Sequence, residues 1–309
     1  RVGFKASSLG QMMKNGLADR IPAGSGLSFE FFDRFMKAPG RDGRALNEKI
    51  DEVLAGIAAR KPDGKVTVDN LTDEDFRDLA SVRQLIVEAE MPTDLRLVVE
   101  SKADMLRARH GDHGFYVRSS FNLEDHPEVS ASGHYETMPD GKEMNRVKTN
   151  AEVLEAVKRV ISQKYSEQAF MMRLRYGIAD KDVYGGVMIK VPGRSLAPAE
   201  EGSKTRSGTM LTFNPSTKDK GEIEIKGALG YGGVVSSKGE PAKVIFNKST
   251  GRITVERGLP EVTTLNEYAD GVLRSVDLTG EDSSLEIVSE ELVKELASLG
   301  MAIEDMYLN

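Results

Sequence analysis

Residues 114–137 contain the side-chain types that phosphate binding requires. The segment reads GFYVRSSFNLEDHPEVSASGHYET, and its apolar residues 115–117 are typical of a short strand that delivers Arg118 and Ser120 to its end. An arginine keeps its charge and forks onto phosphate oxygens, while a loop of small residues such as 130–133 lets backbone N–H groups approach an anion. Together these features predict a phosphate-binding cradle.

The same residues also have a plainer interpretation. Arg-Ser-Ser after a strand is a common sequence, and a turn of Ser, Ala and Gly is usually only a turn. Taken alone, the segment leaves both interpretations open, so the rest of the chain has to decide between them.

The composition excludes several classes of protein. The 309 residues suffice for one large domain or two lobes, and the net charge of −7 argues against a general nucleic-acid or membrane-surface binder. The absence of cysteine excludes disulfides, thiol catalysis and thiolate-bound zinc. No apolar run approaches the roughly 20 residues that span a bilayer, and the start is no signal peptide. We expect a cytoplasmic protein, and because it opens on Arg1 inside a motif, a piece of a longer one.

Apolar residues at steps of three and four predict helices in the first part of the chain. An aromatic helix face holds Phe31, Phe32 and Phe35, after a turn at 21–24. Further helices are predicted at 45–60, from Thr72, from Pro92 to Leu106, and from Thr149 to about Gly177. Thr72 with Asp75, and Thr149 with Glu152, have the spacing of a capping box.

From Asp182 onward the sequence changes to short strands. They are predicted at 183–191, 207–213, 222–226, 234–235, 244–246 and 253–255. A last helix is predicted from the capping box of Ser283 and Glu286 to Met306.

The motifs resemble those of one family, the nucleotide-binding domain of phosphoenolpyruvate synthase and pyruvate phosphate dikinase. This domain also occurs in rifampin phosphotransferase and the glucan water dikinases. Its pattern Val-Arg-Ser-Ser…Glu-Asp…Ala-Gly…Thr is similar to Val117–Ser120, Glu124–Asp125, Ser132–Gly133 and Thr137. The resemblance is collinear along the chain, with its strongest blocks at 2–36, 114–137, 207–235 and 296–307.

This resemblance implies an α+β fold of the ATP-grasp type, in which two lobes clasp a nucleotide. The lobes would be residues 1–187 and 188–309, with the hinge at the strand between them. Arg118 would be the catalytic residue, and the family's phosphate-binding lysine corresponds to Lys5. The ATP-binding residues that the resemblance implies are Lys5, Arg118, Ser120, Gly133, Thr137, Met188 and Lys190.

The hinge departs from the family's pattern. Met188 stands where the family has Gln, and Lys190 where it has Met, although the backbone there would still hold the adenine. Tyr231 stands where the family has a glutamate. These departures favour the rival interpretation, a degenerate module of this fold with a regulatory or assembly role.

The resemblance also implies partners. In the family's enzymes, ATP with Mg²⁺ phosphorylates a histidine on a separate carrier domain, and a further domain binds the acceptor. None of the 4 histidines lies in the carrier motif, so we expect both domains outside this sequence. In the family, Asp-x-Glu and Gln-x-Arg strands that supply metal ligands follow the last helix. The sequence stops at Asn309 before both and does not tell whether the parent chain carries them, so the metal ligands stay unassigned. A phosphotransferase acting on an antibiotic or a glucan is a further alternative.

Overall fold

The computed structural model describes residues 2–124, 137–138, 146–192, 206–229, 241–257, 264–269, 272–277 and 289–308. The chain divides into two compact units, Arg1–Pro192 and Gly193–Asn309. Both units combine helical structure with a sheet, which confirms the predicted α+β class. The strand that holds Met188 and Lys190 belongs to the first unit, whereas the sequence-based boundary lies just before Met188. Two lobes that clasp a nucleotide stay a prediction.

The first unit consists of helices around a four-stranded sheet. Its elements are α1 (Phe4–Met12), β1 (Gly24–Leu27), α2 (Phe29–Lys37), α3 (Leu46–Ala59), α4 (Asp73–Glu88), α5 (Thr93–His110), β2 (Tyr116–Ser119), β3 (Thr137–Met138), α6 (Asn150–Ser162), α7 (Glu167–Arg175) and β4 (Val187–Lys190).

Side-chain caps explain where several of these helices begin. The hydroxyl of Thr72 accepts a hydrogen bond from the Asp75 amide, and that of Thr149 from the Glu152 amide, so both predicted capping boxes are confirmed. The prediction of one continuous helix to Gly177 is wrong. α6 ends at Ser162, and the hydroxyl of Ser166 accepts the Ala169 amide to begin α7.

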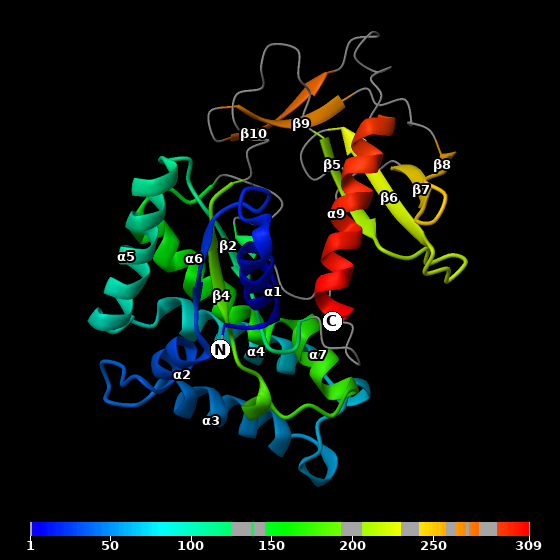
Figure 1. Ribbon diagram of the computed structural model, residues 1–309. Helices are drawn as coiled ribbons and strands as arrows, with labels where there is room; N and C mark the ends of the chain where they lie inside the picture. The colour runs from blue at the N-terminus through cyan, green and yellow to red at the C-terminus, as the bar shows by residue number, and fades with distance from the viewer. Residues whose placement is uncertain are drawn as a thin grey trace. The chain divides into compact units, whose positions relative to one another are not determined.

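The sheet of the first unit is antiparallel, with the strand order β1-β4-β2-β3. One of its faces, with Leu27, Val117 and Ile189, is buried in a core with side chains of α2–α6 (Figure 1). Since side chains alternate along a strand, the intervening residues lie on the opposite face.

Within the described residues, the second unit consists of a four-stranded sheet, a two-stranded hairpin and one helix. Its elements are β5 (Arg206–Leu211), β6 (Glu222–Leu229), β7 (Ala242–Asn247), β8 (Ile253–Arg257), β9 (Thr264–Ala269), β10 (Val272–Asp277) and α9 (Glu290–Leu308). Strands β5-β6-β7-β8 form one antiparallel sheet, and β9 and β10 form a separate hairpin that the sequence analysis did not predict.

Helix α9 covers one face of this sheet. Val293 and Ala297 of the helix share a core with Ile225 and Val244 of the strands. The helix begins at Glu290, after Ser289, whose hydroxyl accepts the Leu292 amide at 3.2 Å. The predicted start at Ser283 and the predicted strand at 234–235 lie outside the described residues.

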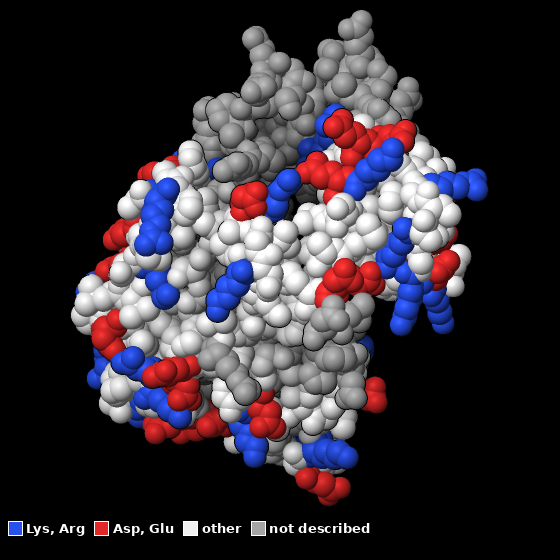
Figure 2. Space-filling model, viewed as in Figure 1, with Lys and Arg blue, Asp and Glu red and all other residues white. Residues whose placement is uncertain are grey.

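Charged side chains of both signs are interspersed over the described part of the face in Figure 2, which fits the many surface ion pairs. Within the described ranges, no helix combines the length and apolar character that crossing a bilayer requires.

Candidate functional site

The strand register places four residues on one face of the first sheet, three predicted ATP-binding residues and Tyr116. Arg118 of β2 lies opposite Met188 of β4, and Tyr116 lies opposite Lys190. Paired residues of adjacent strands point to the same side, and these pairs alternate with Val117 and Ile189 of the core. We call Tyr116, Arg118, Met188 and Lys190 the site face. Met188 and Tyr116 are buried there, while Arg118 and Lys190 are partly exposed.

The two cations of the site face affect each other. Burial lowers the pKa of Lys190, and the positive charge of Arg118 lowers it further. Among the described residues, neither Arg118 nor Lys190 forms an ion pair with an acid. The site face therefore holds two neighbouring positive charges without a described counter-charge.

Strand β1 contributes glycines beside this face. Gly24 lies opposite Lys190 and Gly26 opposite Met188. A Cβ at Gly24 would lie 3.5 Å from the Lys190 Cγ, and one at Gly26 would lie 3.3 Å from Val2. The missing side chains therefore leave space for the Lys190 stem and for the segment that leads into α1.

Three segments meet closely at the end of β2. The Ser120 amide donates to the Gly186 carbonyl at 2.8 Å, and the Ser120 hydroxyl accepts the Ala6 amide of α1 at 3.1 Å. Gly3 has φ 79°, and a Cβ there would lie 1.8 Å from the Ser120 carbonyl oxygen, so only glycine fits. These contacts fix the first turn of α1 beside the strand that carries Arg118 (Figure 1).

Lys5 lies in this first turn of α1 and forms an ion pair with Glu124. The Glu124 side chain is only 2% exposed, and its other oxygen accepts the Phe121 amide at 3.0 Å. Lys5 itself stays 30% exposed. The acid therefore holds the lysine beside Ser120, while part of the lysine side chain stays accessible.

The remaining predicted residues are placed in part or not at all. The backbone of Thr137 in β3 pairs with Arg118, so it adjoins the site face, whereas Gly133 lies outside the described residues. No sequence motif had assigned a role to Tyr116, Gly24 or Gly26. The two-residue spacing of the glycines in the sequence Gly24-Ser25-Gly26 could have indicated that both lie on one face of a strand.

The described residues provide no obvious metal site. Within those ranges, no group of three or more His, Asp or Glu side chains is arranged to hold a metal ion. The metal ligands thus stay unassigned.

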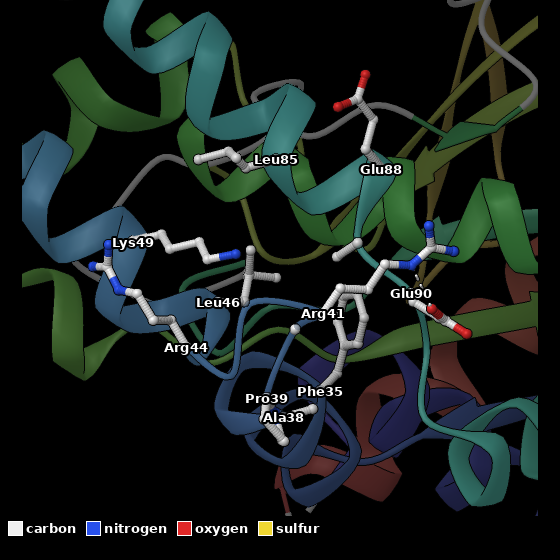
Figure 3. A pocket seen from close by; sticks show the side chains of 12 residues that line it. Phe35, Ala38, Pro39, Arg41, Arg44, Leu46, Lys49, Leu85, Glu88 and Glu90 are labelled. Atoms are coloured by element: carbon white, nitrogen blue, oxygen red, sulfur yellow. Dashed lines mark hydrogen bonds and ion pairs between the residues drawn. The ribbon is translucent and has the colours of Figure 1, made fainter.

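A cavity of about 320 Å³ lies elsewhere in the first unit, between the 38–45 loop, the start of α3 and the end of α4. Figure 3 shows Arg41 beside Glu90, and the two form an ion pair at 3.2 Å. The other two cations of its lining are paired as well, Arg44 with Glu52 and Lys49 with Asp42. The charges in the cavity are already neutralised, and its lining includes none of the predicted ATP-binding residues. The site face is therefore the better candidate for binding an anion.

Comparison with known protein families matches residues 1–309 to the pyruvate phosphate dikinase, AMP/ATP-binding domain. The chain belongs to this family. The predicted recognition is thereby confirmed, and the site face is a feature of an AMP/ATP-binding domain.

Curated relatives of this AMP/ATP-binding domain are enzymes. The chain is 29% identical to a probable phosphoenolpyruvate synthase of Methanocaldococcus jannaschii, over 99% of the chain and 23% of the relative. It is 26% identical to the phosphoenolpyruvate synthase of Pyrococcus furiosus, over 99% of the chain and 39% of the relative. It is 22% identical to the rifampicin phosphotransferase of Bacillus subtilis, over 98% of the chain and 31% of the relative. The chain thus spans less than half of the length of each.

Proposed function

We propose that this domain binds ATP against the site face and supplies phosphate to a histidine on a separate domain, within an enzyme of the phosphoenolpyruvate synthase type. The observation that carries the proposal is Arg118, a partly buried arginine in the sheet with no acidic partner among the described residues. An ATP-grasp arrangement of the two units belongs to the same proposal.

Arg118 would act through charge. Phosphoryl transfer needs mainly positioning and neutralisation of the developing negative charge, so no side-chain nucleophile is required in this domain. A guanidinium that is already held in place costs no reorganisation when that charge develops. Lys5 pairs with Glu124, so it would add a second, partly accessible charge at the end of β2 by exchanging that acid for phosphate, and Ser120 keeps α1 in position through its hydroxyl.

Strand β4 would contribute through side chains. It pairs with β1 on one side and β2 on the other along its whole length, so the two ladders occupy its backbone N–H and C=O groups. Val191 also donates its amide to the Ala23 carbonyl at 2.8 Å. We therefore propose that Met188 and Lys190 meet the nucleotide with their side chains, and that the adenine edge is read by backbone beyond this strand.

Mg²⁺ is expected to bind together with the ATP phosphates. It keeps several waters, binds substrate phosphates directly and needs few protein ligands. It would neutralise part of the triphosphate charge that Arg118 and Lys5 do not. Gly133 and Thr137, as the predicted cradle loop, would cover the phosphates.

The proposal is tested by transfer of phosphate from radiolabelled ATP to the full-length protein, scored as acid-labile, base-stable label. Arg118→Ala is expected to reduce the rate by roughly 100- to 1,000-fold, because it removes an electrostatic contact to the transition state. Arg159→Ala is the matched control, since Arg159 is exposed on α6 and pairs with Glu155. Wild-type transfer by Arg118→Ala would contradict the proposal.

The final acceptor defines the second candidate. Similarity to a rifampicin phosphotransferase supports, as the second candidate, a variant in which the phosphate reaches a small molecule other than pyruvate. To separate the two candidates, pyruvate or rifampicin is added to the phosphorylated protein, and the loss of label to each acceptor is measured. A degenerate module would take up no label at all. The predicted cytoplasmic location stays a prediction.

A further inference from the structure

Lys190 differs from three other shielded lysines of this chain. Lys61 pairs with Asp75, Lys164 with Asp180 at 2.9 Å, and Lys243 with Glu256 at 2.7 Å. Lys190 has no such acid among the described residues, and the nearest charge that lowers its pKa is another cation, Arg118. A desolvated ammonium beside a guanidinium is unfavourable unless an anion joins them.

Neither residue paired with Lys190 in the sheet is an acid. The residue opposite it in β1 is Gly24, which has no side chain, and the Lys190 Cγ lies against that glycine. On the other side lies Tyr116 of β2, and Arg118 is diagonal to Lys190 on the same face. Diagonal neighbours on a sheet are roughly 7–8 Å apart, a span that a chain of phosphate groups can bridge with both cations.

We propose that the Lys190 ammonium is a further phosphate-binding cation, which acts with Arg118 on the phosphate chain of a nucleoside triphosphate. The inference rests on the proposed function and goes beyond it, because it assigns the Lys190 ammonium to the phosphate chain and to joint action with Arg118. Lys190 would thereby increase the preference of the domain for triphosphates over less charged ligands.

The test separates phosphate from base. Affinities of the purified protein for Mg-ATP and for Mg-tripolyphosphate, which has no base, are measured by displacement of a fluorescent ATP analogue. Lys190→Met keeps the length of the side chain and removes the charge. It is expected to lower the affinity for both ligands by the same factor, roughly 10- to 100-fold. Lys190→Arg keeps a charge at this position and is expected to retain most of the affinity.

A matched control lies on the opposite face of the same sheet. Lys102 of α5 donates to the Ser25 hydroxyl of β1 at 2.9 Å, so Lys102→Met removes a lysine near β1 without touching the site face. Its affinities are expected to equal those of the wild type. The melting temperature of each variant is compared with that of the wild type, so that a loss of affinity can be distinguished from unfolding.

Each other outcome overturns the inference. If Lys190→Met weakens Mg-ATP but not tripolyphosphate, Lys190 contacts the base. If it weakens neither ligand while Arg118→Ala weakens both, this inference fails and the proposed function stands. If the wild type binds neither ligand, or if Arg118→Ala binds as the wild type does, the proposed function fails together with the inference.

Discussion

The two sheets of this protein differ in whether their neighbouring positive charges are paired with an acid. In the second unit, Lys226 and Lys243 lie directly opposite each other on the face away from the α9 core. Glu224 accepts from both, at 2.8 and 3.1 Å, and Lys243 also contacts Glu256. In the first unit, Arg118 and Lys190 are diagonal neighbours on one face, and no described acid pairs with either of them.

The lysine pKa values follow this difference. Hydrogen bonds from Lys243 to Glu256 and to Glu224 raise the pKa of Lys243, whereas burial and Arg118 lower the pKa of Lys190. Neutralised cations stabilise the folded unit without a ligand, while cations without an acid oppose folding slightly and favour an anion. A pair of like charges on a sheet face therefore indicates binding only when its counter-charge is missing.

The largest expected effect comes from making the first sheet resemble the second. Lys190→Glu puts a carboxylate beside Arg118, and the expected result is a loss of Mg-ATP affinity of roughly 100-fold or more, because the acid both neutralises the arginine and repels phosphate. Calorimetric titration measures it, and the melting temperature is expected to stay the same or rise. Retained affinity in this variant would break the comparison.

The converse change in the second sheet is expected to cost stability. Glu224→Gln removes a carboxylate that is only 2% exposed and leaves Lys226 and Lys243 opposite each other without it. We expect the local free energy of opening to fall by about 1–3 kcal/mol. Hydrogen exchange of peptides from β6 and β7 measures this, and unchanged protection would show that the acid does not hold the two lysines.

The pH dependence of that effect has a defined sign. Burial opposes ionisation of Glu224, but hydrogen bonds from Lys226 and Lys243 prevail and lower its pKa below the ordinary 4.5. A carboxyl whose folded pKa is lowered contributes stability above its unfolded pKa, and this contribution disappears as the pH falls through the folded value. The difference in opening free energy between wild type and Glu224→Gln should therefore be full near neutral pH and shrink below about 4.5. A difference that grows in acid would contradict the assignment.

The smallest expected effect is that of Glu256→Gln. Glu256 is 42% exposed and contacts Lys243 at 2.7 Å at the edge of the same network. Solvent screens such a pair, so we expect a loss below about 1 kcal/mol in the same exchange experiment. A loss as large as that of Glu224→Gln would mean that exposure does not separate the two acids.

The sequence predicted the helices well where their capping signals were local. Thr72, Asp75, Thr149 and Glu152 are enough to start α4 and α6, because a cap is a contact within four residues. The break at Ser166 was missed because the apolar spacing continues across it, although a Ser before Glu is itself a start signal. The β9–β10 hairpin was missed despite Asp270-Gly271 between its strands, a typical turn sequence.

The candidate site was predictable only through its residue types. Arg118 and Lys190 were predicted separately, one from a phosphate motif and the other from a hinge, and only the register of β2 and β4 shows that they share a face. The pairing of Lys5 with Glu124 joins residues more than a hundred positions apart, and neither the spacing nor the composition indicates it. Long-range pairing depends on the three-dimensional fold, so local patterns do not contain it.

The central claim, that ATP binds to the face of the first sheet that carries Arg118, is tested most directly by calorimetric titration of the protein with Mg-ATP beside its Arg118→Ala variant. The account predicts saturable binding by the wild type and at least a roughly 100-fold weaker affinity in the variant, because a fixed arginine–phosphate contact is lost. Equal affinities in the two proteins would contradict it and would place the nucleotide away from the site face.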